Sequence, residues 1–187
     1  MNLPAKIKAV EKIYTVLDKR TATFKKETGL QCISPCGDCC LKKDIEATVL
    51  EFLPAAYQLY KSDNFNHYLS RLEQNNPSVC VFYNPFSEMG FCAQYESRGL
   101  ICRLFGFSAL INKHLNKKLV TCRHIKELAD PVKVNKNISK APEITSYYWQ
   151  LYGIDPALGM KKWPINTAIL KALNIILLHF RYNKKAG

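Results

Sequence analysis

The sequence predicts a mainly α-helical fold, a single small domain in which helices surround an irregular, cysteine-rich metal-binding core. Two observations lead to this prediction. Apolar side chains recur at helical spacing near both ends of the chain. The segment between them gathers cysteines, aromatic residues, glycines and prolines with no helical or strand period. We therefore expect one domain over residues 1–187, with helices over 3–26 and 164–182 flanking a motif core over 32–122.

The first helix is predicted by a stripe of apolar and amphipathic side chains that share one helical face. A glycine, Gly29, follows at the position where such a helix would end. The next segment, Cys32–Cys40, contains Pro35 and Gly37 and is predicted to be a loop. The stripe consists of Leu3, Ile7, Val10, Ile13, Tyr14, Leu17 and Phe24.

A second helix is indicated by Thr48-x-x-Glu51, a spacing typical of a capping box, and would run to about Tyr60. Pro54 conflicts with this, because it would lie past the first turn. Either the helix kinks at Pro54, or it begins near Leu53 with the proline at its first position.

The rest of the chain is predicted from turn and helix signals. Further helices are expected over 62–73 and 142–152, and Pro164 is expected at the first position of the last helix. Residues 78–106 are predicted to be irregular, with a short hairpin around Ser87–Gly90. The remaining predictions are a surface loop over 131–140 and a connector over 153–162, while 107–128 gives no clear signal.

We expect neither a signal peptide nor a membrane span. The N-terminus has no continuous apolar stretch with a cleavage site, and the most apolar segment, Ile165–Phe180, is short and interrupted by polar residues. We interpret that segment as a buried amphipathic helix. These features predict a cytoplasmic protein, and in a reducing compartment clustered cysteines bind metal more often than they form disulfides.

The net charge is +12, from 27 basic and 15 acidic residues. A basic chain of this kind is compatible with an acidic partner such as nucleic acid, or simply with a solvated basic surface. The basic residues are scattered and form no run of five. Charge alone therefore supports a nucleic-acid partner only weakly.

The cysteines are the residues with the clearest chemistry. Four of the eight fall within nine residues as C-x3-C-x2-C-C, in a polar loop where a core role for the thiols is hard to explain. Thiolates favour zinc and iron–sulfur clusters. We predict an iron–sulfur cluster or iron, with zinc as a close alternative. The predicted ligands are Cys32, Cys36, Cys39, Cys40, Cys80, Cys92, Cys102 and Cys122.

The pairing of these ligands stays open in the sequence. Adjacent Cys39 and Cys40 cannot comfortably serve one tetrahedral ion, so they serve two metals or one of them lies beside the metal. Cys122 could be a buried free thiol. His124, two residues further on, is a candidate ligand, although a histidine without a metal role is more common. The spacing C-x3-C-x2-C also occurs in radical S-adenosylmethionine enzymes, but this chain lacks their alternation of strands and helices.

A second motif gives a more specific comparison. Cys80 is followed by Gly90-Phe91-Cys92-Ala93-Gln94-Tyr95-Glu96-Ser97-Arg98 and then by Cys102-Arg103. Together with the first loop, this resembles the bacterial YkgJ-like family, described as a zinc- or iron-chelating domain with eight cysteines. The resemblance runs from about Cys32 to Cys122. Val81 and Gly99 stand where the family commonly has proline.

The resemblance implies that the eight cysteines are metal ligands, Cys122 less securely than the others. It also implies that Tyr95, Arg98 and Arg103 belong to the cofactor-binding motif. An arginine beside a thiolate cluster can offset negative charge and donate hydrogen bonds to sulfur. Ordinary surface charges would explain Arg98 and Arg103 equally well.

Three functions follow from these features. The first is a metal-binding protein with a structural or electron-carrying role, which would include a protein redox partner. The second is an enzyme, since longer proteins resembling the family are linked to lysine methylation of proteins such as flagellin. No catalytic residue is predicted, however, and no glycine-rich nucleotide loop is present. The third is a nucleic-acid-binding module with a structural zinc.

Overall fold

The computed structural model describes residues 1–33, 36–75, 78–86 and 91–183 and is mainly α-helical, as predicted. In these ranges the regular sheet structure consists of two antiparallel strand pairs, β1 with β4 and β2 with β3. The helices are α1 Leu3–Thr28, α2 Leu53–Lys61, α3 Phe65–Asn75, α4 Leu100–Leu104, α5 Arg123–Leu128, α6 Pro131–Asn137, α7 Ile144–Ile154, α8 Pro156–Gly159 and α9 Ile165–Asn183. The strands are β1 Glu46–Thr48, β2 Ser108–Ile111, β3 Lys117–Val120 and β4 Lys162–Pro164.

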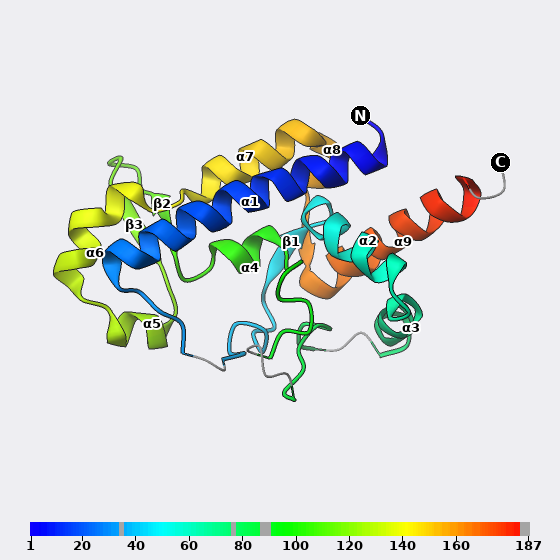
Figure 1. Cartoon of the computed structure of the whole chain (residues 1–187), viewed down its shortest axis with the longest axis horizontal. Coiled ribbons are helices and arrows are strands. Elements are labelled where there is room, and N and C mark those ends of the chain that lie inside the picture. The colour runs from blue at the N-terminus through cyan, green and yellow to red at the C-terminus, as the bar shows by residue number, and fades with distance from the viewer. Residues whose placement is uncertain (34–35, 76–77, 87–90, 184–187) are drawn as a thin grey trace.

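Helix α1 is the longest element and packs against α2, α6 and α7 (Figure 1). Its N-terminus is capped by the Asn2 side chain, which accepts a hydrogen bond from the Ala5 amide. Its C-terminus is closed by Gly29, whose φ of 72° is a left-handed conformation that glycine adopts without strain. The predicted helix over 3–26 is therefore present, two residues longer than expected.

Two hydrophobic cores hold these elements together. The main core lies between α1, α2 and α9 and contains Leu17, Phe52 and Ile169, all almost fully buried. A smaller core lies near the C-terminal end of α1, where Phe24 packs with Ile125 and Val134 from α5 and α6. The smaller core places α5 and α6 at the end of α1 opposite to α9 (Figure 1).

The start of α2 follows the second alternative from the sequence. The helix begins at Leu53, with Pro54 in its first turn, after a short 3₁₀ helix over Leu50–Phe52. The Thr48–Glu51 pair is formed as the capping signal suggests, because the Thr48 amide donates to Glu51 Oε1 at 2.6 Å. The proline is accommodated at a position whose amide has no helical partner.

The surface loop predicted over 131–140 is wrong, because α6 and a 3₁₀ helix over Ile138–Lys140 occupy it. Asp130 caps α6 by accepting from the Val132 and Lys133 amides, and Pro131 stands in the first turn. Burial of Val134 in the smaller core then fixes the helix against α1.

Short elements also interrupt segments predicted without them. Helix α4 lies inside the stretch 78–106, and α8 and β4 lie inside the connector 153–162. The ambiguous stretch 107–128 forms the β2–β3 hairpin and α5. The hairpin predicted around Ser87–Gly90 lies outside the described residues, although Tyr83 and Cys92 on either side of it form an antiparallel bridge.

Among the described residues, none of the helices combines the length and apolar character that a membrane span requires.

Candidate metal centre

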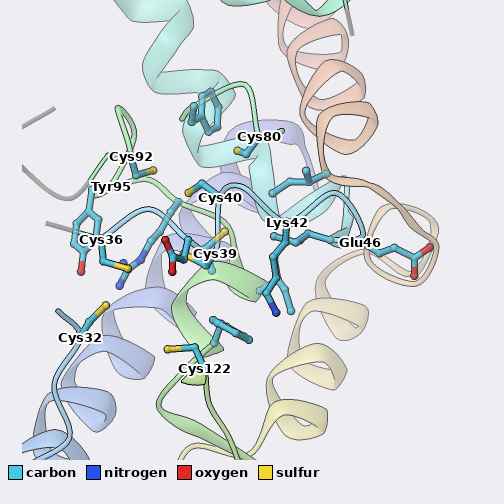
Figure 2. A pocket seen from close by; sticks show the side chains of 18 of the residues that line it. Cys32, Cys36, Cys39, Cys40, Lys42, Glu46, Cys80, Cys92, Tyr95 and Cys122 are labelled. Carbon is cyan, nitrogen blue, oxygen red and sulfur yellow. The ribbon is translucent and has the colours of Figure 1, made fainter. Parts of the chain in front are cut away.

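One cavity of about 400 Å³ is lined by all eight cysteines (Figure 2). The cysteines are free thiols. They come from the loop after α1, the irregular segment between α3 and α4, helix α4 and the N-terminus of α5. Cys40 and Cys80 are buried, whereas Cys32 and Cys39 are exposed. The cavity therefore has buried thiols at its base and exposed thiols at its opening.

A tight turn places Cys39 and Cys40 in the cavity. The Cys40 amide donates to the carbonyl of Gly37 at 2.8 Å. A Cβ atom on Gly37 would lie 2.8 Å from side-chain atoms of Tyr83 and Phe91, so only glycine fits here. The glycine thus lets the first cysteine loop approach the segment that carries Cys92.

Cys80 is positioned by hydrogen bonds from two sides. Its amide donates to the Cys40 carbonyl at 3.1 Å, which joins the two cysteine segments. Asn166, in the first turn of α9, accepts from the Val81 amide and donates to the Val79 carbonyl, both at 2.8 Å. The buried Asn166 side chain therefore fixes the backbone on either side of Cys80.

Cys102 lies on α4, whose N-terminus is held by a buried carboxylate. Glu51 Oε2 accepts from the Ile101 amide at 2.8 Å, while Oε1 accepts from the Thr48 amide. Glu51 is completely buried, and this burial raises the pKa of its carboxyl group. A Cβ atom on Gly99 would lie 2.7 Å from the Phe52 ring, so this glycine allows α4 to approach.

Cys40 lies at the centre of the buried thiols. The thiols of Cys39, Cys80 and Cys92 are the neighbours that act most strongly on the Cys40 thiol, and they raise its pKa. The hydrogen bond from Cys40, with the charge of Arg98, lowers the pKa of Cys39 to about 6 against the opposing effect of burial. The same hydrogen bond is the main cause that lowers the pKa of Cys92 to about 7. At neutral pH the thiolate form is thus favoured at Cys39 and is partly present at Cys92.

The other thiols have different surroundings. Burial raises the pKa of Cys102 well above its ordinary value. Burial, followed by the neighbouring Cys36 thiol, raises the pKa of Cys32 to about 11. The Cys122 Sγ atom accepts from the Ile125 amide at 3.5 Å and thereby caps α5.

The three predicted motif residues fall into two places. Tyr95 and Arg98 line the cavity, and the Arg98 guanidinium stacks on the Tyr95 ring with 4.0 Å between Cζ and the ring centroid. Arg103 is not among the lining residues. It is buried beside Tyr14 and binds Asp18 and the carbonyl oxygens of Glu96 and Arg98. Arg103 therefore fixes the Cys92–Cys102 segment against α1.

The aromatic side chains of Phe52, Phe82 and Phe105, which had no signal in the sequence, form part of the cavity walls. His124, a candidate ligand in the sequence, is not among the lining residues. Its Nε2 atom lies 2.6 Å from Asp38 Oδ2, and this pair joins α5 to the first cysteine loop. The two residues are 86 positions apart, so their spacing in the sequence could not predict the contact.

The thiols share a cavity but are not yet arranged as ligands. Within the described ranges, no three His, Cys, Asp or Glu side chains stand in a geometry that would hold an ion.

Residues 31–123, about half of the chain, match the family model CxxCxxCC, whose description reads “Putative zinc- or iron-chelating domain”. This part of the chain belongs to that family. The CxxCxxCC domain covers all eight cysteines, and its description supports metal binding and leaves the choice of zinc or iron open. In this chain the first gap, Cys32 to Cys36, is one residue longer than the spacing in the family's name. The chain matches no curated protein and no solved structure.

Replacing Asn166 by alanine is expected to weaken metal binding about 10- to 100-fold, as loss of a ligand-orienting group does. It also leaves the Val81 amide and the Val79 carbonyl unpaired, which costs about 1–3 kcal/mol for each buried group. Competition with a chelator measures the affinity, and urea unfolding measures the stability. Asn174→Ala, on the same helix, is the control. Equal affinities for the two variants would show that Asn166 does not position Cys80.

Proposed function

We propose that the protein is an electron carrier in which Cys39, Cys40, Cys80 and Cys92 hold an iron–sulfur cluster. The observation that supports this most is that these four thiols line one cavity, in which Cys40 and Cys80 are buried. An iron–sulfur cluster is bound by four cysteines, and four thiols gather here. Cys102, buried on the same side of the cavity, is a further candidate ligand.

The adjacent cysteines favour a cluster over a single zinc ion. Cys39 and Cys40 are sequence neighbours and cannot comfortably bind one tetrahedral ion together. A cluster has several irons, so neighbouring thiolates can bind different ones. The cavity of about 400 Å³ also has room for more than one ion.

The side chains around these thiols suit a redox group. Phe52 and Phe82 line the cavity and limit water access, and Arg98 supplies positive charge near Cys39 and Cys92. Burial and nearby charge are among the factors that set the potential of a cluster. When bound, the cluster would supply one-electron chemistry. Tyr95 and Cys39 are exposed at the opening, where a protein redox partner would approach.

The test is the iron and acid-labile sulfide content of protein purified without oxygen, with its visible absorbance before and after reduction. The proposal predicts iron and sulfide in equal amounts and an absorbance that bleaches on reduction. A colourless protein that contains zinc and no sulfide after reconstitution would contradict it and would indicate a structural metal.

Arg98→Gln is expected to shift the reduction potential of the protein to a more negative value. The reduced state carries one more negative charge, and removal of a nearby positive charge destabilises it. Arg98 lies close enough to influence Cys39 and Cys92, and its Nε atom has no hydrogen-bond partner in the part of the chain that the structure describes.

A redox titration measures this shift. Arg98→Lys retains the charge and should lie closer to the wild-type protein. Arg123→Gln removes an arginine that is 86% exposed and should leave the potential almost unchanged. Equal potentials in Arg98→Gln and Arg123→Gln would show that Arg98 does not act on the cluster.

A further inference from the structure

Helix α1 carries a row of four exposed lysines, Lys8, Lys12, Lys19 and Lys26. They follow one another at intervals of four, seven and seven residues, so they lie on one side of a helix with 3.6 residues per turn. The opposite side of α1 is buried in the two hydrophobic cores. At a rise of about 1.5 Å per residue, the row is about 27 Å long. Basic residues that are scattered in the sequence are thus lined up on one surface.

This row carries more positive charge than its neighbours neutralise. Within the part of the chain that the structure describes, none of the four lysines forms an ion pair. Of the three carboxylates on α1, Asp18 pairs with Arg103 and Glu27 pairs with Lys140. The third, Glu11, is half-buried. The lysines are therefore free to bind a negatively charged partner.

Helix α7 runs alongside α1 (Figure 1). Lys6 on α1 binds Asp155 at the C-terminal end of α7, with 2.6 Å between Nζ and Oδ2. Near the other end of α7, Arg20 Nε donates to the carbonyl of Lys140 at 3.3 Å. These two contacts place α7 beside the part of α1 that holds the first three lysines of the row. Trp149, in the middle of α7, is 64% exposed.

We propose that the lysine row on α1 and Trp149 on α7 bind single-stranded nucleic acid. Proteins that bind single strands combine positive charge along the nucleic-acid backbone with aromatic rings on which bases stack. The lysines would contact successive phosphates, and the Trp149 ring would stack on an unpaired base. Tyr152 packs against this ring, with 5.4 Å between the ring centroids, and helps to hold it in place. None of these described side chains lines the cysteine cavity, so the surface is separate from the proposed cluster site.

The composition of this surface favours a single strand over a membrane or a duplex. Thr15 and Thr23 stand among the lysines, and Val16 and Trp149 are the large apolar side chains exposed on the two helices. Two such side chains bury too little apolar area to anchor the protein in a lipid surface. A duplex keeps its bases stacked inside, where Trp149 cannot reach their faces.

The test is the fluorescence anisotropy of a labelled single-stranded oligonucleotide of about 16 nucleotides, titrated with the protein at several salt concentrations. Four phosphate contacts predict that the logarithm of the binding constant falls with the logarithm of the salt concentration, with a slope of about −3. A protein with both Lys12→Gln and Lys19→Gln should bind more weakly, with a slope of about −1.4. The control carries Lys43→Gln and Lys126→Gln, which remove the same charge from exposed positions outside both helices, and should bind like the wild-type protein.

Trp149→Ala tests the stacking contact. It should weaken binding to the single strand about 5- to 150-fold and should leave the weaker binding to a duplex of the same sequence unchanged. Equal losses in the two lysine double variants would show that binding depends on total charge, and would overturn the site. An unchanged affinity in Trp149→Ala would overturn the assignment to a single strand. Binding to vesicles that contain phosphatidylserine, without binding to the oligonucleotide, would also overturn it and would indicate a lipid surface as the partner.

Discussion

Replacement of Cys40 by serine is expected to abolish metal binding at the proposed cluster site. Cys40 is buried and lines the cavity together with Cys39, Cys80 and Cys92, so its replacement removes one of the four proposed ligands. A metal that binds the folded chain and not the unfolded chain stabilises the folded state. At a metal concentration 1,000 times the dissociation constant, the free energy of unfolding rises by about 4 kcal/mol. The variant should therefore unfold with a free energy lower by about that amount when metal is present.

The measurement is chemical unfolding of both proteins with metal and with an excess of chelator. The stability difference should be large with metal and should shrink to about 1 kcal/mol or less in chelator, since serine differs from cysteine by a single atom. Cys122→Ser should show the smaller loss, because Cys122 is not among the four proposed ligands. An equally large difference between wild type and Cys40→Ser in chelator would mean that Cys40 stabilises the fold by packing alone.

Glu51→Ala is expected to be among the most destabilising single substitutions, costing about 3–5 kcal/mol. The change leaves the Thr48 and Ile101 amides and the Thr48 hydroxyl without their acceptor and opens a cavity beneath α4. Because α4 carries Cys102, metal affinity should fall as well. Urea unfolding and chelator competition report the two effects.

Glu73→Ala supplies the control, since Glu73 is exposed on α3 and its replacement should change the stability by about 0.5 kcal/mol or less. A Glu51→Ala protein as stable as Glu73→Ala would show that the buried carboxylate is not a structural tie. Such a result would also remove the reason to link Glu51 with the position of Cys102.

The ends of the fold were predictable because they depend on local patterns. The apolar stripe from Leu3 to Phe24 and the glycine after it predict α1 without knowledge of its neighbours. Helix α6 was missed although Asp130 and Pro131 are good starting residues for a helix. Its seven residues present one buried apolar side chain, Val134, so their periodicity is too short to detect and the helix depends on its contact with α1.

The cysteines were recognisable as a set, but their grouping was not. Their spacing along the chain left open which of them share a metal, whereas the structure brings all eight to one cavity. The residues that position the thiols act over long separations. Asn166 and Val81 lie 85 positions apart, and Glu51 and Ile101 lie 50 apart. Such pairs carry no mark in a single sequence, because each joins an ordinary polar side chain to a backbone amide, a group that almost every residue has.

X-ray absorption at the metal edge of protein purified without oxygen tests most directly that metal is held by cysteine thiolates. We predict a nearest shell made mainly of sulfur around iron, with an iron–iron distance that indicates a cluster, and its loss in Cys40→Ser. A nearest shell of oxygen and nitrogen atoms in the wild-type protein, unchanged in Cys40→Ser, would contradict this account of the cavity.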